Sequence, residues 1–256
     1  MRLVMDIGNT NIKIGLYDGQ HIVHYWRMQT DVNKTTDEYT AGIQTFFMTA
    51  QFDIQQVTGA IISSVVPPIM HTMTMVCKRL FHITPLIVGP GVKTGLNIKY
   101  ENPREVGADR IVNAVAALHI YQKTPCIIID FGTATTYCYI NEHGHYLGGI
   151  ITSGVTIAMQ ALYEHAARLP RIEFVKPRQP IGQTTVDAMQ SGVYYGLLAQ
   201  VEGIVKQLSK DYVKPALVIA TGGLASLIAH DTTTIDVVDE TLTLKGLNII
   251  YERNQK

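Results

Sequence analysis

The chain has 256 residues, of which 46% are hydrophobic and 16% charged, and its formal net charge is zero. This large apolar share excludes a disordered chain. The balanced charge argues against a general nucleic-acid or membrane-surface binder, which would carry a basic excess. No stretch reaches the roughly 18 uninterrupted apolar residues of a membrane span.

The positions of charges and cysteines predict a cytoplasmic protein. Arg2 and Asp6 bring charge too early for a signal peptide, and the first residues already read as a core strand. Cys77, Cys126 and Cys138 are odd in number and lack a Cys-x-x-Cys spacing. We therefore interpret them as reduced apolar fillers rather than as disulfides or zinc ligands.

Residues 2–28 predict three strands, with a polar loop after the first. This loop reads Asp6-Ile7-Gly8-Asn9-Thr10-Asn11. Glycine lets a phosphate approach the backbone, and free N–H groups and hydroxyls donate to its oxygens. Asp18-Gly19 is a hairpin signal between the next two strands. Lys13 is near enough to the loop to reach a phosphate, but it is equally typical of an exposed strand lysine.

Helices and strands then alternate, which implies parallel strands joined by helical crossovers. The expected elements are a helix over 36–52, a strand over 59–66, a helix over 69–81 and a strand over 85–88. Asp37 is a plausible cap for the first of these helices. Asn102-Pro103 resembles the start of a further helix, on which Ile111, Val115 and Leu118 would share one face.

The segment Gly107-Ala108-Asp109-Arg110 has two interpretations. In the first, Asp109 complements the dipole of a helix N-terminus and Arg110 is exposed. In the second, Asp109 is a general base beside a guanidinium that grips an anionic substrate. The residues alone leave both open.

The second half of the chain repeats the layout of the first. The strand Ile128–Asp130 leads into Phe131-Gly132-Thr133-Ala134-Thr135-Thr136, and a hairpin with a turn at residues 141–144 follows. The later expected elements are a helix over 156–169, a loop over 170–180, a long helix preceded by Thr184-Thr185 and running through Ala188 to Leu208, a strand over 216–220, a helix over 224–229 and a helix over 244–253. Gly222-Gly223 after a buried strand could carry a base or ribose, or could be a plain helix-start turn.

The two Asp-x-Gly loops lie about half a chain length apart. We therefore expect two similar halves, residues 1–124 and 125–256, that clamp a polyphosphate between their loops. In this interpretation Asp130 holds a cation, directly or through water.

Four motifs in this order resemble type III pantothenate kinases over essentially the whole chain. They are Asp6-Ile7-Gly8-Asn9-Thr10, Gly107-Ala108-Asp109-Arg110, Asp130-Phe131-Gly132-Thr133-Ala134-Thr135 and Thr221-Gly222-Gly223. The resemblance implies an α/β, duplicated ribonuclease-H-like fold of the actin-like ATPase, sugar kinase and Hsp70 superfamily, with two halves around a nucleotide cleft. It also implies ATP-dependent phosphorylation of pantothenate on its primary hydroxyl, the first step towards coenzyme A.

The resemblance also implies roles for individual residues. Asp109 would be the general base. Asp130 would bind a monovalent cation, K⁺ or NH₄⁺, and Asp6 would hold Mg²⁺. The implied ATP-binding residues are Asp6, Gly8, Asn9, Thr10, Asn11, Lys13, Gly132, Thr133, Gly222 and Gly223. The implied pantothenate-binding residues are Tyr100, Gly107, Ala108, Asp109, Arg110 and Thr185. The implied partners are ATP, pantothenate and a second copy of the chain as a homodimer, with no nucleic acid and no membrane.

One departure from the family pattern stands at Ser153, where proline is usual. Proline would fix φ and stiffen the turn, so serine is expected to leave it looser. The alternatives are a kinase of the same fold for another small alcohol, a non-catalytic regulator, and an ATPase that works by conformational change. The three carboxylates Asp6, Asp109 and Asp130 argue against the regulator, and the short chain argues against the ATPase.

Overall fold

The computed structural model describes residues 1–210 and 214–255, which form two compact units. The first unit contains Met1–Leu96, Tyr100–Gln122 and the segment from Thr241 onward. The second contains Asn97–Lys99 and Lys123–Glu240. No helix within the described residues is long and apolar enough to cross a membrane.

The first unit is built on a five-stranded sheet in the order β3-β2-β1-β4-β5. Its strands are β1 (Arg2–Ile7), β2 (Asn11–Tyr17), β3 (Ile22–Gln29), β4 (Gly59–Ser64) and β5 (Leu86–Ile87). β1, β2 and β3 are antiparallel, whereas β1, β4 and β5 are parallel. The predicted hairpin is confirmed, because Gly19 adopts a φ of +129° in the β2–β3 turn.

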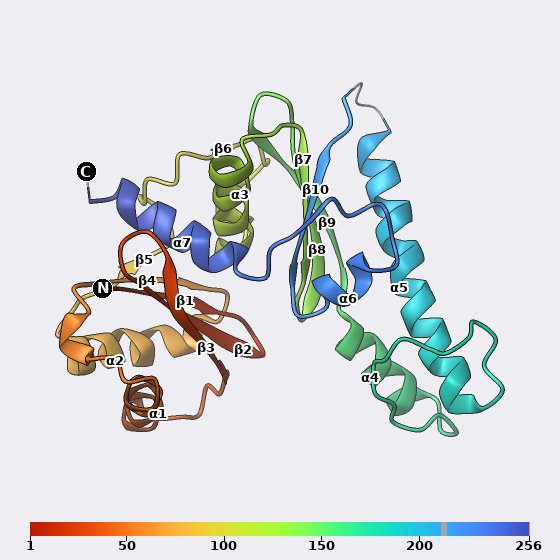
Figure 1. Ribbon diagram of the computed structural model, residues 1–256, viewed down its shortest axis with the longest axis horizontal. Helices are drawn as coiled ribbons and strands as arrows, with labels where there is room; N and C mark the ends of the chain where they lie inside the picture. Colours follow the sequence, from red (N-terminus) through yellow and green to blue (C-terminus); the bar gives the residue numbers. More distant parts are fainter. Residues whose placement is uncertain (211–213, 256) are drawn as a thin grey trace. The chain divides into compact units, whose positions relative to one another are not determined.

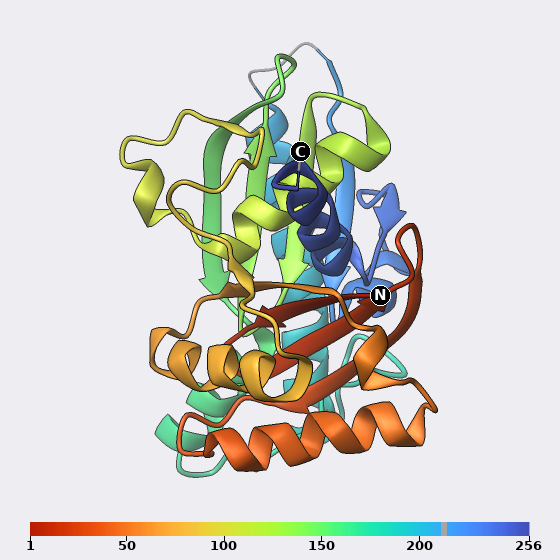
Figure 2. The ribbon, with the colours of Figure 1, turned by 90° about the vertical axis from the view of Figure 1, so that its left-hand side faces the viewer.

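Helices cover both faces of this sheet (Figures 1 and 2). Leu3, Met5 and Ile7 of β1 point to a core shared with α1 (Thr36–Thr49) and α2 (Met70–Phe81). Val4 points the other way, to a core shared with α3 (Ala108–Tyr121) and α7 (Leu242–Arg253). The strict alternation along a strand thus fixes Asp6 on the α3 and α7 face.

Two helix starts differ from the sequence prediction. α1 is capped by Thr35, not Asp37, because Thr35 and Glu38 exchange hydrogen bonds in a capping box. Asn102 does cap a helical turn, but that turn is only the 3₁₀ segment Pro103–Glu105. The chain is extended at Val106, which is buried, and α3 begins afresh at Ala108. Asn102 therefore does not start the long helix.

The second unit has a six-stranded sheet in the order β11-β10-β7-β8-β9-β6. Its strands are β6 (Asn97–Ile98), β7 (Cys126–Phe131), β8 (Ala134–Ile140), β9 (His145–Ser153), β10 (Leu217–Gly222) and β11 (Val237–Val238). Strands β9-β8-β7-β10-β11 match β3-β2-β1-β4-β5 in order and direction. The predicted structural duplication is thus confirmed at the level of topology.

One face of the second sheet packs on the long helix α5 (Thr185–Ser209). Ile127, Ile129 and Phe131 of β7 share a core with Tyr194 and Val201 of α5. The remaining helices are α4 (Val155–His165), which ends four residues before the predicted Leu169, and α6 (Ala225–Ala229). As expected, the α4–α5 connection has no regular structure over residues 170–180.

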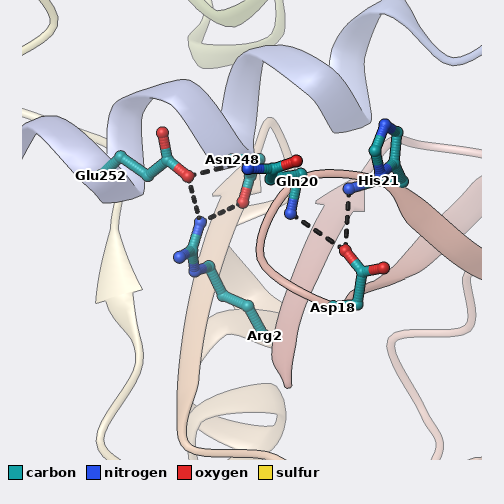
Figure 3. A network of polar contacts seen from close by, with 6 residues as sticks. All are labelled: Arg2, Asp18, Gln20, His21, Asn248 and Glu252. Carbon is teal, nitrogen blue, oxygen red and sulfur yellow. Dashed lines mark hydrogen bonds and ion pairs between the residues drawn. The ribbon is translucent and has the colours of Figure 1, made fainter.

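The last helix packs in the first unit, which the division at residues 124 and 125 did not anticipate. Arg2 of β1 donates hydrogen bonds to Asn248 and Glu252 of α7 (Figure 3). Its guanidinium carbon also lies 4.8 Å from the centre of the Tyr251 ring. The close packing of α7 against α3 also holds α7 in the first unit. Gly246 permits it, since a Cβ there would lie 2.2 Å from the carbonyl oxygen of Val112.

The cysteines behave as apolar fillers. Cys77, Cys126 and Cys138 are all buried and none of them forms a disulfide. Burial raises the pKa of the Cys77 and Cys126 thiols to about 12, so both stay protonated at neutral pH.

Candidate active site

The first polar loop lies where β1 ends, and the buried carboxylate of Asp6 stands just before it. Ser63 of β4 donates a hydrogen bond from Oγ to Asp6 Oδ1 over 2.6 Å. The loop closes tightly, because the Gly8 N–H donates to the carbonyl of Asn11 over 3.0 Å. Thr30, the residue directly after β3, holds the loop by donating from Oγ1 to the Gly8 carbonyl over 2.7 Å. The backbone of the loop is thereby fixed at the end of the sheet.

The residues at the tip of this loop face solvent. Asn9 and Thr10 are exposed, and Gly8 and Asn11 are half-buried. Lys13 pairs with Asp6 across the β1–β2 ladder, so the two side chains share one face of the sheet. A lysine at this place is near enough for an anion bound at the loop, and the structure therefore keeps the phosphate interpretation of Lys13 open.

The Gly107–Arg110 motif lies at the same end of the same sheet. A Cβ on Gly107 would lie 3.7 Å from Val65 Cγ1, and the Val65 N–H donates to the carbonyl of Ile7 over 3.1 Å. Gly107 therefore sits beside the ends of β1 and β4. The structure brings the Asp109 motif and the Asp6 loop together within the first unit.

Asp109 lies in the first turn of α3, and its Oδ1 accepts a hydrogen bond from the Arg110 N–H over 2.8 Å. A Cβ on Gly107 would lie 2.5 Å from that Oδ1, so glycine makes room for the carboxylate. The Asp109 side chain is half-buried, as suits a base that must meet both a substrate and solvent. Arg110 is only 7% exposed, which rules out the interpretation of a solvent-exposed arginine.

The second polar loop follows β7 as the first follows β1. Its tight turn is closed by the Gly132 N–H, which donates to the Ala134 carbonyl over 3.2 Å. Behind it, the Gly154 N–H donates to the Thr133 carbonyl over 3.1 Å, and a Cβ on Gly154 would lie 2.3 Å from the same oxygen. Ser153, in the place of the usual proline, is exposed at the end of β9.

The Gly222-Gly223 turn lies beside this loop. β10 and β7 are parallel neighbours that pair Gly222 with Phe131. Gly222 has a φ of +93°, and a Cβ there would lie 2.6 Å from the Phe131 backbone. The Gly223 N–H donates to the Phe131 carbonyl over 3.2 Å, while its Cα is open on the outside. The second unit thus gathers Asp130, Gly132, Thr133 and the glycine pair at one end of its sheet.

Two predicted pantothenate-binding residues, Thr185 and Tyr100, do not lie at this end of the second sheet. Thr185 is the exposed first residue of α5. Gln200, which contacts Thr152 at the end of β9, lies about 22 Å further along that helix. Tyr100 is half-buried in the connection between β6 and the Pro103–Glu105 turn.

The structure also shows site residues that sequence reasoning missed. Ser63 binds Asp6 from a strand more than fifty residues away, and Gly154 supports the second loop. Ser63 lies near the end of the buried strand β4, and its partner becomes evident only from the strand register. No three histidine, cysteine, aspartate or glutamate side chains group as metal ligands within the described part of the chain. A cavity of about 710 Å³ between the β2–β3 hairpin and α7 contains none of the predicted site residues.

Residues 2–207 match the sequence profile of the type III pantothenate kinase family. The chain belongs to this family. It is 54% identical over 254 residues to a type III pantothenate kinase from Halalkalibacterium halodurans, covering 99% of this chain and 100% of that protein. It is 56% identical over 254 residues to one from a Geobacillus species, covering 99% and 98% of the two chains.

The fold is that of actin-like ATPases and sugar kinases. The activator of 2-hydroxyisocaproyl-CoA dehydratase from Clostridium difficile, solved with bound ADPNP, superposes with a TM-score of 0.56. The alignment covers 99% of this chain and 94% of that one, at 12% identity. Because five strands of the second sheet repeat the order of the first, the chain has the duplicated ribonuclease-H-like fold that the sequence predicted.

Proposed function

We propose that this protein transfers the γ-phosphoryl group of ATP to the primary hydroxyl of pantothenate, as the first step of coenzyme A synthesis in the cytoplasm. Family membership over the full chain supports the reaction. The observation that carries the chemistry is the position of Asp109. This half-buried carboxylate lies at the start of α3, at the same end of the first sheet as the Asp6 loop.

In this proposal Asp109 acts as the general base. The hydroxyl oxygen of pantothenate attacks the γ-phosphorus, the bond from that phosphorus to the bridging oxygen breaks, and ADP leaves. The hydroxyl proton passes to a carboxylate oxygen of Asp109. Phosphoryl transfer depends mostly on positioning and charge neutralisation, and a base adds about 10²–10⁴-fold.

The ATP phosphates would bind at the two glycine loops. Residues Gly8, Asn9, Thr10, Asn11 and Lys13 supply donors in the first unit, and Gly132 and Thr133 in the second. The fixed loop backbones and exposed tips support this assignment. The open backbone of Gly223, together with Gly222, would lie against the adenosine.

Two ions fit the oxygen donors of the site. The buried Asp6 carboxylate, held by Ser63, is a ligand suited to Mg²⁺, directly or through water. Asp130 is flanked in the strand register by the hydroxyl residues Thr136 and Thr221. A carboxylate beside hydroxyl oxygens can hold a cation, and the family resemblance makes this cation K⁺ or NH₄⁺. When bound, these cations neutralise phosphate charge.

Pantothenate would contact Tyr100, Gly107, Ala108, Asp109, Arg110 and Thr185. The family resemblance gives this set, and the burial of Arg110, whose backbone N–H donates to Asp109, supports the part of the set around Asp109. We further propose that the protein is a homodimer. Exposed apolar side chains occur on α4 and at or just before the start of α5, where Thr185 lies: Ile157, Leu162, Ile181 and Val186.

The test is ADP release from the purified protein with ATP, Mg²⁺ and pantothenate, in potassium and then in sodium salts. Release that requires pantothenate and rises with potassium is expected. Release without pantothenate would point to an ATPase or to another alcohol acceptor. No release in either salt would favour a non-catalytic regulator.

A further inference from the structure

The two units carry the same pair of positions on neighbouring strands. In the first unit, Asp6 of β1 pairs in register with Ser63 of β4. In the second, Asp130 of β7 pairs in register with Thr221 of β10. Since β7 and β10 occupy the places of β1 and β4 in the strand order, Thr221 is the structural counterpart of Ser63.

The side chains of Asp130 and Thr221 lie on one face of their sheet. Ile129 and Phe131 of β7, and Ala220 of β10, point to the core formed with α5. By the alternation of a strand, Asp130 and Thr221 point to the opposite face. Paired residues on adjacent parallel strands are close enough for a hydroxyl to reach a carboxylate, as the 2.6 Å bond between Ser63 and Asp6 demonstrates.

The two hydroxyls differ in one respect. Ser63 is fully buried and bonded to Asp6, whereas the Thr221 hydroxyl is fully buried and has no hydrogen-bond partner among residues 1–210 and 214–255. A buried hydroxyl without a partner is unfavourable, so the position of Thr221 beside Asp130 calls for a physical explanation.

We propose that Thr221 is a positioning residue for Asp130: its hydroxyl donates to the Asp130 carboxylate when the monovalent cation is bound. The proposal rests on the proposed cation role of Asp130. The bond requires a change in the Thr221 side-chain rotamer, because the Thr221 hydroxyl has no hydrogen-bond partner in the described part of the chain. The bond leaves the other carboxylate oxygen oriented toward the cation, in the way that outer partners orient metal ligands.

The test compares Thr221→Val, which replaces the hydroxyl by a methyl group of similar size, with Thr221→Ser, which keeps it. The matched control is Thr243→Val on α7. Thr243 is also buried, and its hydroxyl likewise finds no partner in the part of the chain described. The readouts are the melting temperature of the nucleotide-free protein in sodium and potassium chloride at equal ionic strength, and the potassium concentration for half-maximal activity.

Thr221→Val is expected to melt in sodium at the wild-type temperature or above, because no hydrogen bond is lost. Its half-maximal potassium concentration should rise about tenfold. Potassium should also raise the melting temperature of Thr221→Val by less than it raises that of the wild type. Thr221→Ser and Thr243→Val should respond to potassium like the wild type.

Two outcomes would overturn the inference alone. One is a wild-type potassium response in Thr221→Val. The other is a loss in Thr221→Ser as large as in Thr221→Val, which would mean that packing of the methyl group matters and not the hydroxyl. A wild-type protein indifferent to potassium in both readouts would instead reject the cation role of Asp130, and the inference with it.

Discussion

Ser63 Oγ lies 2.6 Å from Asp6 Oδ1, and the two residues, far apart in sequence, are buried side by side on parallel strands. The bond satisfies a carboxylate that is only 8% exposed. Ser63→Ala removes this donor from a buried carboxylate. The expected loss is about 1–3 kcal/mol in the free energy of unfolding, measured by urea titration, together with weaker ATP–Mg²⁺ binding.

Ser209→Ala at the end of α5 is the control for this substitution, and it should change stability by less than about 0.5 kcal/mol. If Ser63→Ala unfolds at the wild-type urea concentration, the hydrogen bond does not stabilise the folded state.

The Asp109 carboxylate is predicted to remove the proton from the pantothenate hydroxyl. Asp109→Asn keeps the shape of the side chain but cannot act as a base. Turnover should fall by about 10²–10⁴-fold, with ATP affinity nearly unchanged. Steady-state kinetics combined with a direct ATP-binding titration separate the two effects. Near-normal turnover in this variant would remove Asp109 from the mechanism.

Gly107→Ala tests the placement of the same carboxylate. The new Cβ would lie 2.5 Å from Asp109 Oδ1, so the side chain must turn away. Because a flexible carboxylate yields easily, the fold should tolerate the change while turnover drops. A variant with normal turnover would show that the observed orientation of Asp109 is not needed.

The sequence predicts the parts of this structure that depend on residues close together in the chain, and it misses those that depend on distant residues. The strands of both hairpins follow from local alternation, and the repeated Asp-x-Gly loops gave the duplication. Asn102 was correctly read as a cap, yet the helix after it is a single turn, because buried Val106 is extended there. Such a tertiary requirement leaves no mark on the local pattern.

Long-range partners escaped prediction for the same reason. The bond from Ser63 to Asp6 depends on the register of two strands, and α7 packs with the first unit through contacts to Arg2. Neither the register nor these contacts can be read from periodicity. The roles of the individual ATP- and pantothenate-binding residues remain predictions from the family resemblance.

Asp231, after α6, links the α4–α5 connection to α5 within the second unit. It accepts hydrogen bonds from Lys176 over 2.6 Å, from Tyr194 and from His230. The bond from Lys176, followed by those from Tyr194 and His230, holds the pKa of Asp231 well below its ordinary value of 3.8. A lowered pKa in the folded protein means that the stabilisation is complete above about pH 5 and is lost as the pH falls below 3.8.

Asp231→Asn should therefore lower the melting temperature at pH 7, and its difference from the wild type should narrow between pH 5 and pH 3. Asp37→Asn is the comparison, because Asp37 forms an ion pair of equal length with Arg79, but on the exposed surface. It should shift the melting temperature very little. A difference between Asp231→Asn and wild type that is constant with pH would contradict the ionic origin of the effect.

Gly222 should be the least replaceable glycine of the proposed adenosine turn. Its φ of +93° disfavours any side chain, and a Cβ would lie 2.6 Å from the backbone nitrogen of Phe131, which cannot move without breaking the β7–β10 pairing. Gly222→Ala should lower the free energy of unfolding by about 2–4 kcal/mol and raise the KM for ATP.

Gly203→Ala on α5 is the control, since nothing lies within 4 Å of its Cβ position and alanine favours a helix. That control should be neutral or up to about 1 kcal/mol more stable. Equal stability of the two variants in urea titrations would show that β10 and β7 can separate at this turn without penalty.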